Sequence, residues 1–370
     1  MQNETSSPTI LVTGGLGYIG SHTVVELIVA LNENKLHLQN NDTTKCKVLI
    51  IDDLSNASSA VLGRIKKLLE KSHNITNTDD YLEFVKLDIL NLSSLESLFD
   101  KKAKDGNPIE YIIHFAAKKL VGESVKIPLL YFELNFGGTL NILKCMEKYN
   151  CNNFIFSSSC SVYGKNDDCK EDDQVTFNSP YACTKLCVEH MLKAVAMVKK
   201  NLRVISLRYF NPCGAHESGM IGDAPTTYPN NLFPFIEELA IGKREYLSIF
   251  GSDYQTKDGT GVRDYVHVVD VANAHVIAIN KLSKISSYEV YNLGTGNGYS
   301  VLEIIKTYSK VIGKELPYKL VDRRPGDVDV AQCQPSKALA ELNWKAVKNL
   351  EDMCRDSYRW ITSNPEGIKE

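Results

Sequence analysis

The sequence lacks any apolar run as long as the roughly 18 to 20 residues that a membrane-spanning helix needs. Its start, Met1-Gln-Asn-Glu-Thr-Ser-Ser7, is too polar for the apolar part of a secretory signal. The formal net charge of −3 indicates no basic surface for a polyanion, so nucleic acid is not an expected partner. We therefore expect a cytoplasmic protein with no membrane contact.

The sequence also lacks the spacings that are typical of disulfide frameworks and metal sites. Its ten cysteines include no Cys-x-x-Cys pair, which favours reduced thiols. Its eight histidines form no cluster with metal-ligand spacing, so we expect no metal. The 370 residues are 43% apolar, which is enough for a large core and indicates two lobes.

What the chain does contain is a glycine-rich turn near its start. Residues 9–12 predict a buried strand, and residues 18–31 predict a helix. Between them, Gly14, Gly17 and Gly20 allow a tight turn, close approach of the backbone to a pyrophosphate and close helix packing. The spacing differs from the commoner Gly-x-Gly-x-x-Gly, so the second and third glycines carry the prediction of a dinucleotide site.

The next apolar stretch, residues 47–51, ends at two aspartates. A carboxylate at Asp52 can accept hydrogen bonds from the adenosine ribose of NAD, and it repels the 2′-phosphate of NADP. The sequence therefore predicts NAD as the cofactor. A purely structural role for Asp52 is the alternative.

More predicted strands follow at residues 82–87, 111–115, 153–156 and 202–207, with helical patterns between them. This alternation predicts an α/β fold, a Rossmann-type doubly wound parallel sheet that binds ligands at the carboxyl ends of its strands. We expect residues 1–207, joined by about 266–295, to form the NAD-binding domain. Residues 208–265 and 296–370 should form a smaller α/β substrate-binding lobe.

Tyr181 and Lys185 follow Pro180, which suits the first turn of a helix, so both side chains should share one helix face. An adjacent ammonium group stabilises a phenolate, so we expect a lowered pKa for Tyr181 and a role as general base. The hydroxyl of Ser159, just past a predicted strand, is placed to bond Tyr181 and a substrate oxygen. The alternatives are an exposed Tyr and Lys and a serine that caps a strand end.

These segments resemble the extended short-chain dehydrogenases/reductases. The resemblance rests on Thr13-Gly-x-x-Gly17-x-x-Gly20, His114-Phe-Ala116, Phe156-Ser-Ser-Ser159 with Val162-Tyr-Gly164, and Tyr181-x-x-x-Lys185. Further segments make the chain similar, almost end to end, to the UDP-glucose 4-epimerases, also called UDP-galactose 4-epimerases. They are Val121-Gly-Glu-Ser124, Leu207-Arg-Tyr-Phe-Asn-Pro212, Pro229-Asn-Asn-Leu232, Asp258-Gly-Thr-Gly-Val-Arg-Asp-Tyr265, Tyr291-Asn-Leu-Gly294 and Arg323-Arg-Pro-Gly-Asp327.

The resemblance implies a set of site residues. Catalysis is assigned to Tyr181, Lys185 and Ser159. Contacts to NAD are assigned to these three and to Gly14, Gly17, Tyr18, Ile19, Gly20, Asp52, Asp88, Ile89, Phe115, Ala116, Ala117, Lys119, Asn135 and Phe210. Contacts to the sugar nucleotide are assigned to Lys119, Ser159, Tyr181, Asn211, Asn231, Leu232, Phe250, Arg263, Arg324, Asp327 and Ala331.

The implied reaction is reversible epimerisation at carbon 4 of UDP-glucose and UDP-galactose, through a transient 4-keto sugar and with bound NAD. The forked side chains of Arg263 and Arg324 suit a diphosphate, although for each arginine alone a surface salt bridge is the alternative. In similar enzymes a tyrosine at the position of Ala331 narrows the hexose pocket. The small Ala331 implies that UDP-N-acetylglucosamine and UDP-N-acetylgalactosamine are also substrates, unless Gln332 or another side chain fills the space.

Two other functions are weighed against epimerisation. Related 4,6-dehydratases have an acidic pair after the strand that ends here at Ser159, whereas this chain continues with Cys160 and Ser161 and has no carboxylate until Asp167. A non-catalytic NAD-sensing regulator would need the glycine turn but could dispense with the catalytic residues. All three catalytic residues are present, so we expect an enzyme.

The resemblance also implies a homodimer formed by helices of the first lobe, including the helix of Tyr181. Leu140, Leu143, Met191 and Leu192 could belong either to that interface or to the core. The Asn- and Lys-rich residues 32–44 are longer than the usual connection in the family. We expect them to form a polar loop on the surface.

Overall fold

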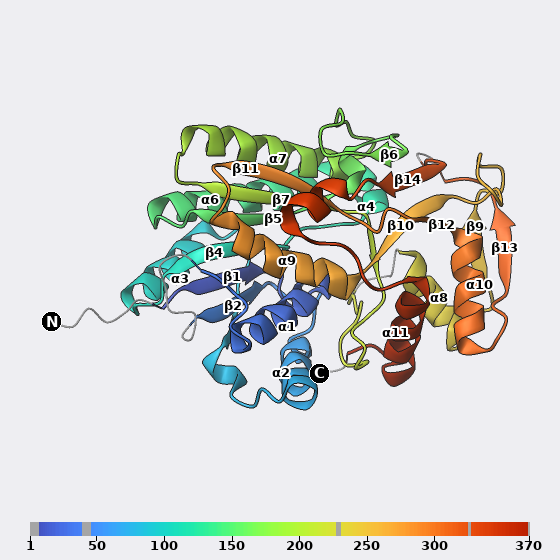
Figure 1. Cartoon of the computed structure of the whole chain (residues 1–370), viewed down its shortest axis with the longest axis horizontal. Coiled ribbons are helices and arrows are strands. Elements are labelled where there is room, and N and C mark those ends of the chain that lie inside the picture. Colours follow the sequence, from blue (N-terminus) through green and yellow to red (C-terminus); the bar gives the residue numbers. More distant parts are fainter. Residues whose placement is uncertain (1–6, 39–45, 227–230, 325–326, 369–370) are drawn as a thin grey trace.

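A parallel sheet of seven strands is the centre of the molecule (Figure 1). The computed structural model describes residues 7–38, 46–226, 231–324 and 327–368. The strand order is β11-β7-β5-β4-β1-β2-β3. The strands are β1 (Thr9–Thr13), β2 (Lys47–Asp52), β3 (Leu82–Lys86), β4 (Ile109–His114), β5 (Asn153–Ser159), β7 (Arg203–Tyr209) and β11 (Tyr288–Leu293). The order reverses between β1 and β4, which is where ligands bind in open sheets of this kind.

Both faces of the sheet are buried, because successive side chains of each strand point to opposite faces. Ile10 and Val12 belong to one hydrophobic core, and Leu11 between them belongs to the other. One face is covered by α1 (Tyr18–Asn32), α2 (Ala60–His73) and α9 (Val268–Leu282). The other face is covered by α3 (Leu92–Lys104), α6 (Gly138–Lys148) and α7 (Pro180–Val198) (Figure 1).

After forming part of the second lobe, the chain returns to the large sheet. Helix α9 packs along α1, although more than two hundred residues separate them, and β11 adds the seventh strand beside β7. This arrangement follows the expected return of residues 266–295 to the first lobe. The predicted α/β fold class is confirmed, whereas the exact domain limits stay a prediction.

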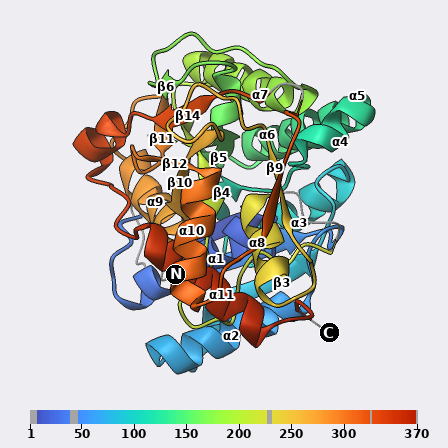
Figure 2. The ribbon, with the colours of Figure 1, turned by 90° about the vertical axis from the view of Figure 1, so that its right-hand side faces the viewer.

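The smaller lobe lies to the right of the large sheet in Figure 1 and faces the viewer in Figure 2. Its five-stranded sheet has the order β12-β10-β14-β6, with β8 paired to β10, and a two-stranded sheet joins β9 and β13. These strands are β6 (Asp168–Cys169), β8 (Asn211–Cys213), β9 (Leu247–Phe250), β10 (Val262–His267), β12 (Gly298–Ser300), β13 (Tyr318–Val321) and β14 (Val330–Cys333). Its helices are α8 (Leu232–Ala240), α10 (Val301–Ile312) and α11 (Leu350–Ser363).

Helices α10 and α11 both begin with a capping box, Ser300 with Glu303 and Asn349 with Asp352. Between β4 and α6 the chain forms the short elements α4 (Val121–Lys126), α5 (Pro128–Tyr131) and the π-helical η3 (Phe132–Gly137). No helix in the described ranges combines the length and hydrophobicity needed to cross a bilayer.

The long connection after α1 is not simply a polar surface loop. Leu36 and Leu38 are buried in the core between α1, α2 and α9. The side chain of Asn280 on α9 accepts a hydrogen bond from the His37 amide at 2.7 Å and donates to the Lys35 carbonyl at 2.9 Å. Lys35 and His37 are exposed as expected, but the expectation was wrong for Leu36 and Leu38, which anchor this segment to the protein. Residues 39–45 lie outside the described part.

Candidate active site

The glycine turn brings three backbone segments into close contact. Gly14 has φ of +66°, a left-handed conformation that favours glycine. A Cβ atom on Gly20 would lie 2.3 Å from the Gly14 carbonyl oxygen, and one on Gly14 would lie 2.7 Å from the Ala116 amide nitrogen. No larger residue fits at either position without displacing backbone. The turn, the start of α1 and the loop after β4 therefore form one compact surface.

The first turn of α1 provides the features of a pyrophosphate site. Gly17 is the N-cap residue and, because glycine has no side chain, it provides no capping group. The amide groups of Tyr18, Ile19 and Gly20 lack partners within the helix, as the first amides of any helix do, and they lie at its positive end. A bound pyrophosphate would accept hydrogen bonds there. These residues thus fit a dinucleotide.

Asp52 ends β2 beside this turn and is buried. Its carboxylate accepts hydrogen bonds from the backbone amides of Leu16 at 3.2 Å and Leu54 at 3.0 Å. Burial raises the pKa of Asp52, and these two bonds oppose that shift. The carboxylate thus ties the glycine turn to β2, and it lies where the sequence predicts the ribose contact.

Most of the remaining residues assigned to NAD lie just past parallel strands and so share one edge of the sheet, whereas Asn135 lies in η3. Asn135 is buried, and its amide side chain accepts from the Lys118 amide at 2.8 Å and donates to the Lys118 carbonyl at 3.0 Å. It therefore fixes the loop that follows β4. Those on this edge are Asp88 and Ile89 after β3, Phe115, Ala116, Ala117 and Lys119 after β4, and Phe210 after β7.

The catalytic residues assigned from the sequence meet between β5 and α7. The Ser179 hydroxyl accepts a hydrogen bond from the Ala182 amide at 3.2 Å, and Pro180 opens the helix. Lys185 donates from Nζ to the Ser157 carbonyl at 2.6 Å, and its ammonium group lies 4.9 Å from the ring centroid of Phe156. The Ser159 hydroxyl, at the end of β5, accepts a hydrogen bond from the Ser161 amide at 3.2 Å and lies near enough to the Tyr181 phenol to lower its pKa.

The pKa values of this pair differ from the sequence prediction. Burial raises the pKa of Tyr181 to about 12, and the nearby Ser159 hydroxyl opposes the shift only in part. Burial also lowers the pKa of Lys185 to about 7, while the Glu189 carboxylate raises it. The predicted lowering for Tyr181 is therefore wrong for the protein without ligands. Desolvation of the phenolate exceeds any stabilisation by its neighbours.

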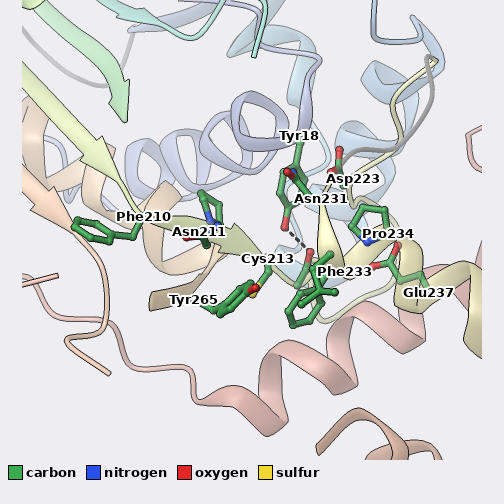
Figure 3. A pocket seen from close by; sticks show the side chains of 13 residues that line it. Tyr18, Phe210, Asn211, Cys213, Asp223, Asn231, Phe233, Pro234, Glu237 and Tyr265 are labelled. Atoms are coloured by element: carbon green, nitrogen blue, oxygen red, sulfur yellow. Dashed lines mark hydrogen bonds between the residues drawn. The ribbon is translucent and has the colours of Figure 1, made fainter. Parts of the chain in front are cut away.

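A cavity of about 140 Å³ lies between the two lobes (Figure 3). The Tyr18 side chain extends into this cavity, and its hydroxyl donates a hydrogen bond to the Gly214 carbonyl at 2.6 Å. The Lys119 ammonium group lies 5.9 Å from the Tyr18 ring centroid and 3.9 Å from the Asp223 carboxylate. The cavity lining includes residues assigned to NAD and residues assigned to the sugar nucleotide, namely Tyr18, Phe210, Asn211, Asn231 and Leu232.

A second group of assigned substrate residues converges in the smaller lobe. Asp327 accepts a hydrogen bond from Arg324 Nε at 2.9 Å and lies 3.9 Å from Arg263 Nη2. The Arg324 guanidinium lies 5.0 Å from the ring centroid of Phe250. The charge of Arg263 lowers the pKa of Cys160, the residue after Ser159, although burial raises that pKa overall to about 12. Two guanidinium groups and an aromatic ring thus face one region.

Ala331 lies directly beside Arg263, because β14 pairs with β10 in parallel register at these two residues. The neighbouring Gln332 bonds the Gly296 carbonyl at 2.7 Å through its side-chain amide. Side chains alternate along a strand, so Gln332 and Ala331 point to opposite faces. Of the motif residues, Pro229, Asn230, Pro325 and Gly326 lie outside the described part of the chain.

Sequence reasoning missed several charged residues at the site. Asp223 and Glu237 line the cavity, and burial raises the pKa of Glu237 to about 8. Glu189 and Arg208 form a buried ion pair behind Lys185. Glu189 follows Lys185 by four residues, so helical spacing could have identified it. The cavity carboxylates have no such signal, because they meet Tyr18 of the first lobe only when the two lobes come together.

No group of three or more His, Cys, Asp or Glu side chains in the described ranges is arranged to hold a metal ion. The site instead offers amide groups, a lysine, a phenol and arginines. These groups fit a dinucleotide cofactor and an anionic ligand.

Comparisons with known proteins agree with this arrangement. The model of the NAD dependent epimerase/dehydratase family matches residues 10–294. The UDP-glucose 4-epimerase of Bacillus subtilis is 46% identical over 362 residues, which cover 97% of this chain and 98% of that protein. The UDP-glucose 4-epimerase from Bifidobacterium longum, in complex with NAD+ and UDP, has a TM-score of 0.85 and 39% identity, with coverage of 97% and 99%.

A further solved relative is the UDP-Glc/GlcNAc 4-epimerase from Campylobacter jejuni, with 31% identity and a TM-score of 0.77. The match covers 96% of this chain and 100% of that one. The family match spans most of the chain, and the similar proteins align over nearly their full length. This chain belongs to the NAD dependent epimerase/dehydratase family.

Proposed function

We propose that the protein interconverts UDP-glucose and UDP-galactose by epimerisation at carbon 4, with NAD bound. The observation that carries the proposal is the convergence of Ser159, Tyr181 and Lys185 at the sheet edge that also holds the glycine turn. The near full-length similarity to UDP-glucose 4-epimerases supports the choice of reaction. The absence of an acidic pair after β5, where Cys160 and Ser161 stand, disfavours dehydration.

In this reaction Tyr181 takes the proton of the 4-hydroxyl group and later returns it, and Ser159 bonds the same oxygen. Bound NAD would supply the hydride acceptor and the positive charge of an oxidised nicotinamide. The residues that would hold it are those of the glycine turn, Asp52 and the loop after β4. Burial raises the pKa of Tyr181 to about 12. A phenolate there therefore needs a positive charge close by, which would lower that pKa.

The substrate would be held by its nucleotide. Arg263 and Arg324 offer two forked cations for a diphosphate, and Phe250 offers an aromatic face beside them. Strong contacts on the diphosphate and weak contacts on the hexose suit this reaction, because the 4-keto sugar must present its other face before the hydride returns.

The direct test is conversion of UDP-galactose to UDP-glucose by the purified protein, together with identification of the nucleotide released on denaturation. We expect turnover without added cofactor and the release of NAD, since the cofactor is regenerated in each cycle. No turnover would contradict the proposed reaction. Release of NADP alone would contradict the role of Asp52.

We further propose that UDP-N-acetylglucosamine and UDP-N-acetylgalactosamine are substrates. Ala331 leaves open the volume that a larger side chain would fill beside Arg263, and the Gln332 side chain is engaged with Gly296 rather than turned toward that space. An acetamido group needs this volume. The Campylobacter jejuni relative is a UDP-Glc/GlcNAc 4-epimerase, which is consistent with such breadth in the family.

The variant Ala331→Tyr tests whether the small side chain at this position allows the acetylated UDP-sugars to bind. A tyrosine ring would overpack the space needed by the acetamido group, at a cost of roughly 1 to 3 kcal/mol or more. We expect kcat/KM to fall at least about tenfold for the acetylated pair and to change less for UDP-glucose and UDP-galactose. An equal effect on both substrate pairs, or a wild-type protein inactive on acetylated sugars, would contradict this proposal.

We also propose a homodimer built on α4, α5 and α7. These helices contact one another and carry exposed apolar side chains, including Leu129 at 83% exposure and Met197 at 73%. Of the residues left open between interface and core, Leu143 and Leu192 are buried in the core and Leu140 is exposed. The cytoplasmic location stays a prediction.

A further inference from the structure

Three successive serines at the end of β5 bind three residues of α7. Two of these contacts involve the catalytic pair, Ser159 with Tyr181 and the Ser157 carbonyl with Lys185. The third lies one helical turn beyond them, where Ser158 Oγ donates to Glu189 Oε1 at 2.5 Å. The contacted residues of α7 are spaced by four, so they share the helix face that meets the strand.

The third contact is extended by a buried arginine. Arg208 Nε donates to Glu189 Oε1 at 3.0 Å, and Nη2 donates to Oε2 at 2.7 Å. Arg208 is also the register neighbour of Ser158, since β5 and β7 pair at these residues. Both partners of this ion pair are 4% exposed. The unit of Ser158, Glu189 and Arg208 thus joins α7 to two strands of the sheet.

The arginine is itself held in place. Arg208 Nη1 donates to the Tyr163 hydroxyl at 2.8 Å, and that hydroxyl donates to Asn292 Oδ1 on β11 at 2.7 Å. A buried ion pair adds little stability compared with apolar side chains of the same volume, so stability alone does not account for it. Its location, one turn after Lys185, indicates a role in positioning.

We propose that Ser158, Glu189 and Arg208 act as positioning residues that hold α7 in register with β5 and keep the Lys185 ammonium group charged beside Tyr181. The inference rests on the epimerase function proposed above. The Glu189 carboxylate is the anion nearest to Lys185 along the helix face, and Lys185 needs one because burial disfavours its charge. None of the three residues touches the reacting atoms.

The electrostatic surroundings of Lys185 decide which readout is informative. Titratable and charged groups face this region from each neighbouring element, namely His114 on β4, Tyr131 on α5, Cys160 after β5, Tyr181 and Glu189 on α7, and Arg208 and Tyr209 on β7. His114 is neutral near pH 7, since burial lowers its pKa to about 3. Glu189 is the group that stabilises the ammonium form of Lys185.

The test compares the pH dependence of kcat with UDP-galactose in the wild-type holoenzyme and in Glu189→Gln/Arg208→Gln. The double variant leaves no unpaired buried charge. Activity that needs the Lys185 ammonium group is lost as pH rises through the pKa of Lys185. Without Glu189 that pKa falls, so the alkaline limb should move to lower pH. We also expect kcat to fall about 100-fold.

The serine provides a second variant should the double variant not fold. Ser158→Ala should lower kcat up to about tenfold, the effect of one hydrogen bond, with KM unchanged. The matched control is Ser287→Ala, which removes a hydroxyl that donates to the Ala196 carbonyl at the far end of the same helix. This control should leave kcat and the pH profile unchanged.

The outcomes separate the inference from the function on which it rests. A wild-type protein that does not convert UDP-galactose would refute the proposed function. If the wild type turns over and the double variant loses activity with its alkaline limb unmoved, the unit is only structural and the inference is overturned. An equal effect of Ser158→Ala and Ser287→Ala would overturn it as well.

Discussion

Gly20 is a residue whose side-chain position is closed by backbone, so its replacement tests the cofactor site most simply. In Gly20→Ala the added methyl group would lie 2.3 Å from the Gly14 carbonyl oxygen and would force the turn away from α1. We expect the NAD content of the purified protein to fall at least about tenfold and stability to fall by roughly 1 to 3 kcal/mol. The measurement is the nucleotide released per protein chain.

Gly63→Ala is the matched control, because a methyl group on Gly63 of α2 would meet nothing within 4 Å. Alanine is the better helix former, so this variant should gain about 0.5 to 1 kcal/mol and keep its NAD. Full NAD retention in Gly20→Ala would contradict the assignment of the turn to the pyrophosphate.

At the scale of elements, the surface of α4, α5 and α7 is the feature to test. Leu129 is the most exposed leucine of this surface, at 83% exposure, and the proposed dimer would bury it. The variant Leu129→Glu would place a carboxylate in that interface. We expect sedimentation at micromolar concentration to show a dimer for the wild type and a monomer for the variant. Val347→Glu changes a residue of the smaller lobe at 71% exposure and should remain dimeric. A wild-type monomer, or a dimeric Leu129→Glu, would contradict the interface.

Elements also mark the limit of what the sequence could predict. Hydrophobic runs located the central strands, but the apolar pattern stopped at Phe156 whereas β5 continues to Ser159. The three polar serines extend the strand and pair with β7, and residues of α7 bond to them from the side. A hydrophobic pattern does not reveal such hydrogen-bond partners. The four-residue spacing placed Tyr181 and Lys185 on one face but gave the wrong direction for the Tyr181 pKa, because spacing does not report how deeply the phenol is buried.

At the scale of the molecule, buried histidines should make stability depend on pH. Burial lowers the pKa of His22 and His114 to about 3 and that of His216 and His275 to about 4. An unfolded histidine binds its proton near pH 6.5, so the unfolded state gains protons first as pH falls. These four residues therefore contribute stability above about pH 6.5 that is lost toward pH 4.

Two buried carboxyl groups act in the opposite direction. Burial raises the pKa of Glu26 to about 7 and that of Glu237 to about 8, so the folded state holds these protons between about pH 4.5 and pH 7, where the unfolded chain releases them. The net uptake on unfolding near pH 5 should then be about two protons. We expect the free energy of unfolding, measured with urea, to fall as the pH is lowered from about 6.5 to about 5. A constant or rising value would contradict the burial of these histidines.

The whole-molecule arrangement explains which site residues could be predicted. The glycine turn and the Tyr-x-x-x-Lys spacing each lie within a short segment of sequence. Their chemistry could therefore be predicted from that segment alone. Arg263, Arg324 and Asp327 required the family resemblance, because their meeting depends on the folding of the smaller lobe. Asp223 and Glu237 depend on the contact between the lobes and were not predictable from either segment alone.

The central claim is that Tyr181 carries the proton of the 4-hydroxyl group in a UDP-sugar epimerase. The most direct measurement is the rate of UDP-galactose conversion by Tyr181→Phe beside the wild type, with the NAD content of both determined. Phenylalanine keeps the ring and removes the transferable proton, so we expect turnover to fall by roughly 10² to 10⁴ while NAD is retained. Wild-type turnover by Tyr181→Phe would contradict the account.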